Sequence, residues 1–275
     1  MTNRARVHIV AGGFPPGMPA GHDHDYARSR LLDWMMKRDE PTTMGNDFND
    51  IDRWLPGSKL MVSYVAGPFL NEQMNEYVKD WLEHGGHWLA FHGTSGGKAV
   101  RVDTNAEGRP RRAMLKQPHH ATLGGFFLNH PPIRKFSVDV RDSGHPITRG
   151  VGGTFEVMDE PYMIEVQEPE KTEILLTAEL GPDASPEGFG FVYEKDTALM
   201  EDGKTRAMGY TKPVGQGSVT YFALGHCHTP NSNVQPFVEE NVSADKKTPM
   251  LFRGPWIVPE FEKLVENSID YALGF

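Results

Sequence analysis

Two apolar segments of this chain end in the same pair of residues, a histidine beside a glycine. Residues 88–91 run into His92-Gly93, and residues 221–224 run into Gly225-His226. Ligands of open parallel sheets bind in the crevice beyond the carboxyl ends of the strands, where a glycine lets them approach the backbone. An imidazole there can act as a general acid or base near neutral pH, or as a metal ligand. Either histidine alone could be a hydrogen-bonded loop residue, but the repeated context favours a functional site.

Further polar residues follow the first apolar segment of the chain. Residues 7–11 end in Gly12-Gly13, and Gly21-His22-Asp23-His24-Asp25 comes shortly afterwards. The alternation resembles a metal cluster, but neighbours in an extended chain point to opposite sides. At least one of the two aspartates is instead expected to cap a helix.

An acidic pair, Asp159-Glu160, lies just before Tyr162 and between two segments that resemble strands. A glutamate beside a histidine would fix the tautomer of the ring and raise its basicity. Adjacent carboxylates in a solvated loop are the structural alternative. His130 and His145 each precede a proline, which restricts the backbone there. His145 is expected to be structural.

Two candidate nucleophiles fit their motifs poorly. Ser95 lies in Gly93-Thr94-Ser95-Gly96-Gly97, which satisfies G-x-S-x-G, but the residues after it make a poor helix and a nucleophile elbow needs one. Cys227 adjoins His226 in sequence, a spacing that rarely aligns a nucleophile with its base. The chain has neither a Walker A loop nor a G-x-G-x-x-G motif after its first strand. A serine hydrolase that uses Ser95 stays an alternative.

The elements that must position these residues begin with alternating strands and helices. Strands are expected at residues 7–11, 59–65 and 87–92, with a helix up to about residue 38 and a second, amphipathic helix from Asn71 to Gly85-Gly86. This order is the βαβ signature of an α/β protein with a mostly parallel sheet and helices on both faces.

The pattern changes after the third strand. Residues 94–125 form a long polar stretch, which we interpret as a loop insertion. The C-terminal half is rich in predicted strands, followed by a final helix over residues 259–273; the strands are expected at residues 136–140, 154–157, 162–166, 173–178, 190–193, 207–210 and 218–223. No linker or repeat divides the 275 residues, which predicts one domain.

Composition narrows the classes of function. Lys plus Arg number 28 and Asp plus Glu 37, so the net charge is 28 − 37 = −9, which opposes non-specific binding to nucleic acid or anionic lipid. A single cysteine excludes an intramolecular disulfide framework. No apolar run is long enough for a membrane span, and the first is too short for a signal peptide. We expect a cytoplasmic protein, and a homo-oligomer is compatible with the sequence.

The chain resembles the ThuA-like family, the trehalose-utilisation proteins, through a series of short motifs in family order. The matching segments are Ala11-Gly12-Gly13, Gly21-His22-Asp23, residues 85–93, residues 125–130, His145-Pro146-Ile147-Thr148, Asp159-Glu160-Pro161-Tyr162, residues 215–219, Leu224-Gly225-His226 and residues 269–274.

This resemblance implies a flavodoxin-like sheet related to the class I glutamine amidotransferases. Those enzymes place a cysteine just after the central strand, where this chain has His92-Gly93-Thr94, so glutaminase activity is not expected. The family is linked to the uptake and oxidation of disaccharides, including 3-keto sugars. Its histidines correspond here to His92, His130 and His226, and its acidic pair to Asp159-Glu160.

We therefore expect a sugar-processing enzyme, an isomerase, lyase or hydrolase, that acts on a disaccharide or keto sugar by histidine and carboxylate acid–base chemistry. His92, His226 and Glu160 are the predicted catalytic residues. The substrate is expected to contact Gly13, His22, Asp23, Gly93, His130, Asp159 and Tyr162. A divalent metal, zinc or manganese, would be held by His92, His130 and His226. A non-catalytic carbohydrate-binding or regulatory module is the alternative from another class.

Overall fold

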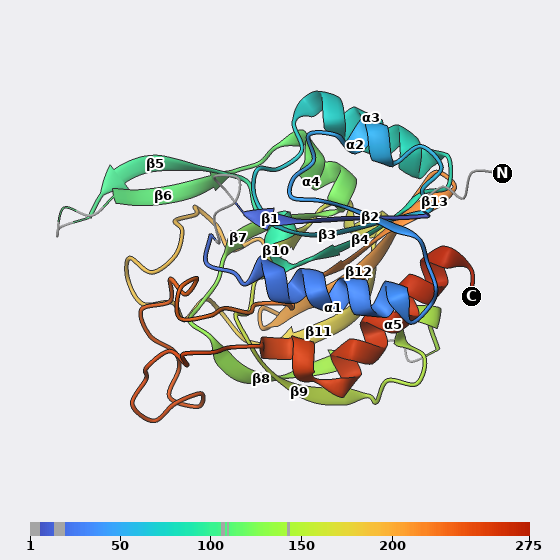
Figure 1. Cartoon of the computed structure of the whole chain (residues 1–275). Helices are drawn as coiled ribbons and strands as arrows, with labels where there is room; N and C mark the ends of the chain where they lie inside the picture. Colours follow the sequence, from blue (N-terminus) through green and yellow to red (C-terminus); the bar gives the residue numbers. More distant parts are fainter. Residues whose placement is uncertain (1–5, 14–19, 106–107, 109, 142–143) are drawn as a thin grey trace.

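The structure is a computed structural model that describes residues 6–13, 20–105, 108, 110–141 and 144–275 (Figure 1). Its centre is a nine-stranded sheet in the order β2-β1-β3-β4-β13-β12-β11-β8-β9. The strands are β1 (Val7–Gly13), β2 (Thr42–Gly45), β3 (Leu60–Ala66), β4 (His87–Phe91), β8 (Arg134–Val140), β9 (Thr154–Asp159), β11 (Glu173–Glu179), β12 (Thr205–Val214) and β13 (Gly217–Phe222).

The sheet has a parallel half and an antiparallel half. The pairs from β2 to β13 are all parallel, and those from β13 to β9 are all antiparallel. Only β12 and β8 therefore oppose the rest, and seven of the nine strands point the same way. The predicted mixed α/β protein with a large, mostly parallel sheet is confirmed.

Two apolar clusters use alternate side chains of the same strands. Leu89 and Phe91 of β4 pack with residues of α1 (His24–Met36) and α5 (Pro259–Leu273). Trp88 and Ala90 pack with α3 (Glu72–Glu83), which also contacts the short α2 (Ile51–Trp54). This alternation follows from the two-residue period of a strand, and both clusters are buried.

The helix that the sequence predicts most clearly, α3, has the expected signals at both ends. The side chain of Asn71 accepts a hydrogen bond from the backbone N–H of Met74, at 2.8 Å. Val78 and Leu82, four residues apart, are buried. The chain leaves the helix through Gly85, whose φ of +96° suits a residue without Cβ. Likewise, α5 begins at Pro259, and Gly274 follows its last residue, Leu273, in a left-handed conformation.

The polar stretch 94–125 is not a structureless loop, contrary to our interpretation. After a 3-10 turn, η1 (His92–Ser95), it forms a hairpin of β5 (Lys98–Thr104) and β6 (Pro110–Leu115), then α4 (Pro118–Leu123). It leads into β7 (Gly125–Asn129), which pairs with β10 (Met163–Val166) outside the main sheet. Both faces of the hairpin are largely exposed, so the apolar alternation that marks a half-buried strand is missing.

The strand predicted at residues 190–193 is wrong, because this segment is irregular in the structure. Val192 N–H donates to the carbonyl of Arg112, at 2.9 Å, but no ladder follows from it. The sequence also missed β2 and α2, which are only four residues long. The short 3-10 turns are η2 (Pro146–Thr148), η3 (Pro169–Lys171) and η4 (Gly254–Ile257). Among the described residues, no helix has the length and apolar character to cross a bilayer.

Buried neutral histidines far from the carboxyl edge predict a loss of stability in acid. Burial lowers the pKa of His8 to about 4, whereas an unfolded histidine titrates near 6.5. Between these values the unfolded chain binds a proton that the folded chain does not, so the free energy of unfolding falls as the pH falls. We predict that His8→Gln reduces this loss, by at most about 1.4 kcal/mol per pH unit.

Urea unfolding at pH 7 and pH 5 measures the effect. His84→Gln is the control, because His84 is exposed at the end of α3 and backbone hydrogen bonding to Asp80 raises its pKa. An equal pH dependence in His8→Gln and the unmodified chain would contradict the prediction.

Candidate metal centre

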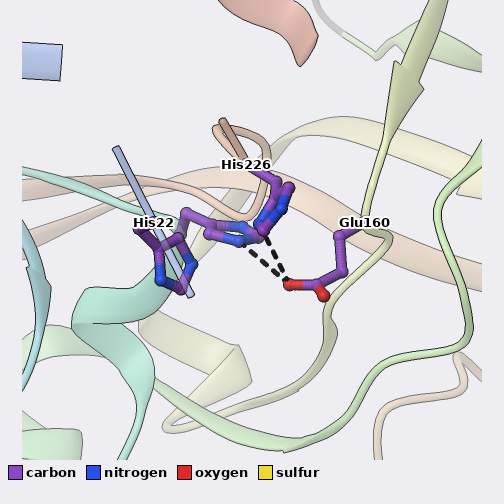
Figure 2. A group of neighbouring side chains, drawn as sticks. His22, Glu160 and His226 are labelled. Atoms are coloured by element: carbon purple, nitrogen blue, oxygen red, sulfur yellow. Dashed lines mark ion pairs between the residues drawn. The ribbon is translucent and has the colours of Figure 1, made fainter. Parts of the chain in front are cut away.

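Three site residues come directly from the carboxyl ends of strands that point the same way. His92 follows β4, and Gly225-His226 comes shortly after β13, its parallel neighbour. Glu160 follows β9 at the far edge of the sheet. His22 joins them from the segment between β1 and α1, and Figure 2 shows it facing the other side chains.

These four side chains form one compact, buried cluster. One ligand atom from each of His22, His92, Glu160 and His226 lies within 4.8 Å of all the others. Glu160 Oε2 is 3.2 Å from His92 Nε2 and 3.5 Å from His226 Nδ1. The ring of His22 packs edge-on against both other imidazoles, with centroids 5.2 Å and 5.0 Å away. Three nitrogens and one carboxylate oxygen are a donor set that suits a divalent transition metal.

The backbone fixes the tautomers of two of the histidines. Nδ1 of His22 lies 2.8 Å from the carbonyl of Ala20, and Nδ1 of His92 lies 2.8 Å from the carbonyl of Ala223. A carbonyl can only accept, so each Nδ1 carries the proton and each neutral ring has its lone pair on Nε2. Both Nε2 atoms are buried and have no hydrogen-bond partner among the described residues.

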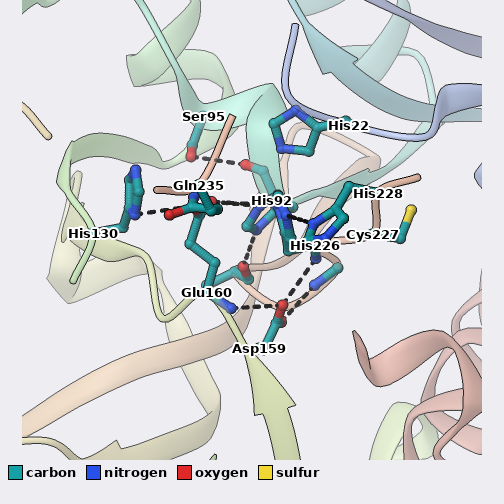
Figure 3. Close-up of polar contacts among 12 residues, drawn as sticks. His22, His92, Ser95, His130, Asp159, Glu160, His226, Cys227, His228 and Gln235 are labelled. Carbon is teal, nitrogen blue, oxygen red and sulfur yellow. Dashed lines mark hydrogen bonds and ion pairs between the residues drawn. The ribbon is translucent and has the colours of Figure 1, made fainter. Parts of the chain in front are cut away.

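A relay of two rings fixes the third histidine (Figure 3). His228 Nε2 donates to the carbonyl of Pro249 at 3.0 Å, which leaves an acceptor at His228 Nδ1. His226 Nε2 therefore donates to that atom, also at 3.0 Å, and its own lone pair is on Nδ1. Within the cluster, this Nδ1 is the third buried nitrogen that has no hydrogen-bond partner among the described residues.

The charge states also suit a cation. Burial lowers the pKa of His22 to about 4 and that of His226 well below its ordinary value, so both rings are neutral near pH 7. Burial alone would raise the pKa of Glu160, but the rings of His130, His226 and His92 outweigh it and hold this pKa below its usual range. Neutral imidazoles at His22 and His226 and an ionised carboxylate at Glu160 are the forms that bind metals.

The second oxygen of Glu160 has its own partners. His130 Nδ1 lies 3.0 Å from Oε1, and Gln235 Nε2 donates to the same oxygen. The predicted metal set of His92, His130 and His226 therefore differs from the observed cluster, in which His22 and Glu160 join His92 and His226. His130 lies on the far side of the carboxylate.

Asp159 contacts the backbone of the site. Its carboxylate accepts hydrogen bonds from the N–H groups of Glu160, Gly225 and His226, at 2.9, 2.8 and 3.0 Å. Burial raises the pKa of Asp159 to about 7. These bonds hold the segment that follows β13, which contains Gly225 and His226, against the end of β9. Asp159 therefore positions both Glu160 and His226.

A cavity of about 790 Å³ opens onto this cluster. Of the predicted residues, His22, Gly93, His130, Glu160, Tyr162 and His226 line it. The ring of Tyr162 stacks on His92 with centroids 3.7 Å apart. Three phenylalanines form an apolar part of the cavity lining: Phe69, Phe127 and Phe191. Such a mix of aromatic walls and a few polar groups is typical of a small-molecule site.

The remaining predicted contacts lie at a second hollow. Gly13 and Asp23 line this hollow of about 450 Å³, which His22 also borders. Asp23 caps α1 by accepting from the N–H of Tyr26 at 3.1 Å, and it pairs with Arg253 at 2.6 Å. The expected helix cap is therefore Asp23.

Neither candidate nucleophile has the geometry of one. The buried hydroxyl of Ser95 donates to the carbonyl of His92 and contacts the hydroxyl of Tyr221, at 3.1 and 2.8 Å. A strand, β5, follows η1 in place of the helix that a nucleophile elbow needs. Burial raises the pKa of the Cys227 thiol to about 12.

Sequence reasoning missed Gln235 and His228 altogether. The sequence could have indicated His228, because it lies two residues after His226. Side chains two residues apart in an extended chain point to the same side. Gln235 lies in an irregular segment without a motif, so nothing in the sequence pointed to it.

The backbone at His92 is strained, which is common at functional sites. Its φ is +43°, a left-handed conformation that costs a non-glycine residue about 1–3 kcal/mol. The next residue is necessarily glycine, since a Cβ at Gly93 would lie 2.5 Å from the carbonyl oxygen of Val65. This turn directs the His92 ring into the cluster.

A mixed α/β fold with a histidine–carboxylate cluster at its carboxyl edge agrees with the comparisons to known proteins. The family model ThuA, described as trehalose utilisation, matches residues 41–239. The chain belongs to this family, as the sequence motifs predicted. A comparison with curated proteins gives no match.

Solved structures share the fold at low sequence identity. A ThuA-like protein from Bacteroides uniformis aligns with a TM-score of 0.61 at 14% identity, over 99% of this chain and 93% of that one. A second, from Parabacteroides merdae, aligns at 0.55 and 14% identity, over 98% and 91%. A β-galactosidase from Rahnella sp. R3 aligns at 0.50 and 14% identity, over 80% of this chain but 28% of the enzyme. At this identity the likeness concerns the fold.

The unpartnered nitrogens predict metal binding. We expect about one Zn²⁺ or Mn²⁺ per chain after equilibrium dialysis, and little in His22→Ala or His226→Ala, because each loses a ligand. Elemental analysis measures the metal, and thermal unfolding adds a second readout, with about 2.7 kcal/mol of stabilisation at a hundredfold excess over Kd. His84→Ala is the exposed control. Equal metal content in all four proteins would refute the centre.

The relay through His228 predicts an effect without direct contact. His228→Leu removes the acceptor for His226 Nε2–H and should weaken metal affinity about 10–100-fold. His228→Gln keeps an amide oxygen that can accept, so it should retain most of the affinity. The two variants are compared by competition with a chromophoric chelator. The relay is wrong if the leucine variant binds as tightly as the unmodified chain.

Proposed function

We propose that this protein is a metal-dependent sugar-processing enzyme, whose cation is held by His22, His92, His226 and Glu160. One observation carries the proposal: three buried imidazole nitrogens that have no hydrogen-bond partner among the described residues converge with one carboxylate oxygen at the cavity. Buried polar atoms are normally paired, so three lone pairs that converge beside a carboxylate oxygen favour a cation between them. Zinc and manganese both accept this donor set.

A disaccharide or keto sugar fits the cavity. Its volume of about 790 Å³ lies in the range of small-molecule pockets, about 300–1,000 Å³. The ring of Tyr162 and the neighbouring phenylalanines offer faces on which a sugar ring can stack. The family description, trehalose utilisation, supports a disaccharide as the substrate.

The position of the site suits a flavodoxin-like sheet, which we infer for the parallel half. The order β2-β1-β3-β4-β13 is the 2-1-3-4-5 order of such folds. Their ligands bind at the carboxyl ends of the strands, where His92 and His226 lie.

A bound divalent cation would supply Lewis acidity towards a carbonyl oxygen of the substrate. His130 is placed to act as the base. Its Nδ1 lies between two acceptors, the carboxylate of Glu160 at 3.0 Å and the carbonyl of Pro131 at 3.1 Å, so Nδ1 carries the proton. Nε2 then holds a lone pair on a side chain that lines the cavity and is 14% exposed.

The proposed step is removal of a proton beside the carbonyl. The C–H bond breaks, the proton goes to His130 Nε2, and the electron pair moves towards the carbonyl oxygen. Glu160 orients His130 through Oε1 while Oε2 faces the histidine cluster. One carboxylate thus links His130 to the histidine cluster. An isomerisation would be completed when the proton returns to the former carbonyl carbon and the neighbouring hydroxyl proton passes to the former carbonyl oxygen.

This assignment predicts that His130→Gln slows proton exchange but keeps the metal. A keto-disaccharide is incubated in D₂O with metal-loaded protein, and proton NMR follows the signal beside the carbonyl. We expect the variant to exchange about 10²–10⁴-fold more slowly, the usual contribution of a general base. His84→Gln is the control with unchanged exchange.

The opposite outcomes are also informative. Exchange by His130→Gln at the unmodified rate would exclude His130 as the base. Sugar binding by the unmodified, metal-loaded protein without exchange would instead favour a non-catalytic carbohydrate-binding module.

A further inference from the structure

The hairpin of β5 and β6 brings positive charge to the mouth of the cavity. It extends from the body of the molecule in Figure 1, and its base borders the cavity through Lys98, Ala99, Arg112 and Met114. Met114 packs against the buried cluster that contains Phe126. The carbonyl of Arg112 accepts from Val192 N–H at 2.9 Å, so the base of the hairpin is fixed to the rest of the chain.

Two arginines lie directly opposite each other on this hairpin. The register pairs Arg101 with Arg112, and it pairs Ala99 with Met114 two residues along. Directly opposed residues share a face, so both arginines are on the face that Ala99 and Met114 turn to the cavity. Like charges in this arrangement repel, and the side chain of Arg112 has no ion-pair or hydrogen-bond partner among the described residues.

The neighbouring arginine shows that pairing is available on the same strand. Arg111 pairs with Asp103 across the hairpin, with 3.1 Å between Nη1 and Oδ2. Lys98, at the cavity mouth, has no such partner in the described part of the chain. The only carboxylate among the described cavity-lining residues is that of Glu160, which the histidines and Gln235 already engage.

We infer that the substrate of this site carries an anionic group, a carboxylate or a phosphate, which Arg112 binds with help from Lys98, since both line the cavity whereas Arg101 donates to Thr104 outside it. The inference rests on the proposed function and names its substrate class. The substrate would be an acidic or phosphorylated sugar whose carbonyl end faces the cluster of histidines and Glu160. An arginine fork matches both anions, since each offers two oxygens to parallel N–H donors. In a chain of net charge −9, a local cationic mouth would also select and attract such a ligand.

Calorimetric titration of the zinc-loaded protein with matched sugars tests this inference. The ligands are glucose, glucuronate and glucose 6-phosphate, which share a ring and differ in charge. We expect at least one anionic sugar to bind about tenfold more tightly than glucose, and high salt to reduce the advantage. The two anionic ligands distinguish a carboxylate from a phosphate.

Matched variants locate the effect. Arg112→Gln should remove most of the anionic preference, about tenfold, and leave glucose affinity and zinc content unchanged. Arg111→Gln, on the same strand, should keep the preference, because Arg111 already has Asp103 as its partner. Circular dichroism of each variant checks that the hairpin change leaves the fold intact.

Each result has a definite meaning. Zinc binding with equal affinity for all three sugars, or an anionic preference that survives Arg112→Gln, would overturn the inference and leave the proposed function standing. Zinc binding without affinity for any sugar would overturn both. A chain that binds neither zinc nor manganese would refute the proposed function directly, whatever the charge preference of the cavity.

Discussion

The chemistry of this site depends on hydrogen bonds made behind the histidine rings. Ala20 and Ala223 hold the protonated nitrogens of His22 and His92, and the pair of His228 and Pro249 does the same for His226. Because each ring has one proton when neutral, these outer contacts decide which nitrogen keeps a lone pair. All three lone pairs are buried beside one carboxylate oxygen, an arrangement that a cation would satisfy and that a dry interior otherwise disfavours.

The sheet supplies the convergence, because β4, β13 and β9 point the same way and end at one edge. The common direction of these strands does not by itself bring Glu160 close to His226, because β9 lies four strands from β13 in the sheet. Asp159 closes that distance by accepting the backbone N–H groups of Gly225 and His226. The two acidic residues therefore have different roles. Asp159 positions the backbone of the site, and Glu160 faces the histidine cluster.

The cavity joins two regions of different charge and chemistry. At its floor, Glu160 links the histidine cluster to His130 through its two oxygens. Elsewhere the lining of the cavity includes Lys98 and Arg112 of the hairpin, whose side chains have no ion-pair partner among the described residues. A ligand held at both ends would be oriented along this axis, which is how binding energy from a remote group can align a reacting carbon.

The sequence by itself determined the alternating strands and helices, the family, and the presence of His92, His226 and Glu160 beyond strand ends, because these follow from periodicity and local motifs. Only the tertiary structure decided that His22 replaces His130 in the cluster and that the polar stretch after β4 is a hairpin. The tautomers were also beyond the sequence: the partner of His92 is Ala223, 131 residues away. Local patterns report which side chains reach an edge, whereas the position of a proton depends on atoms that meet only after folding.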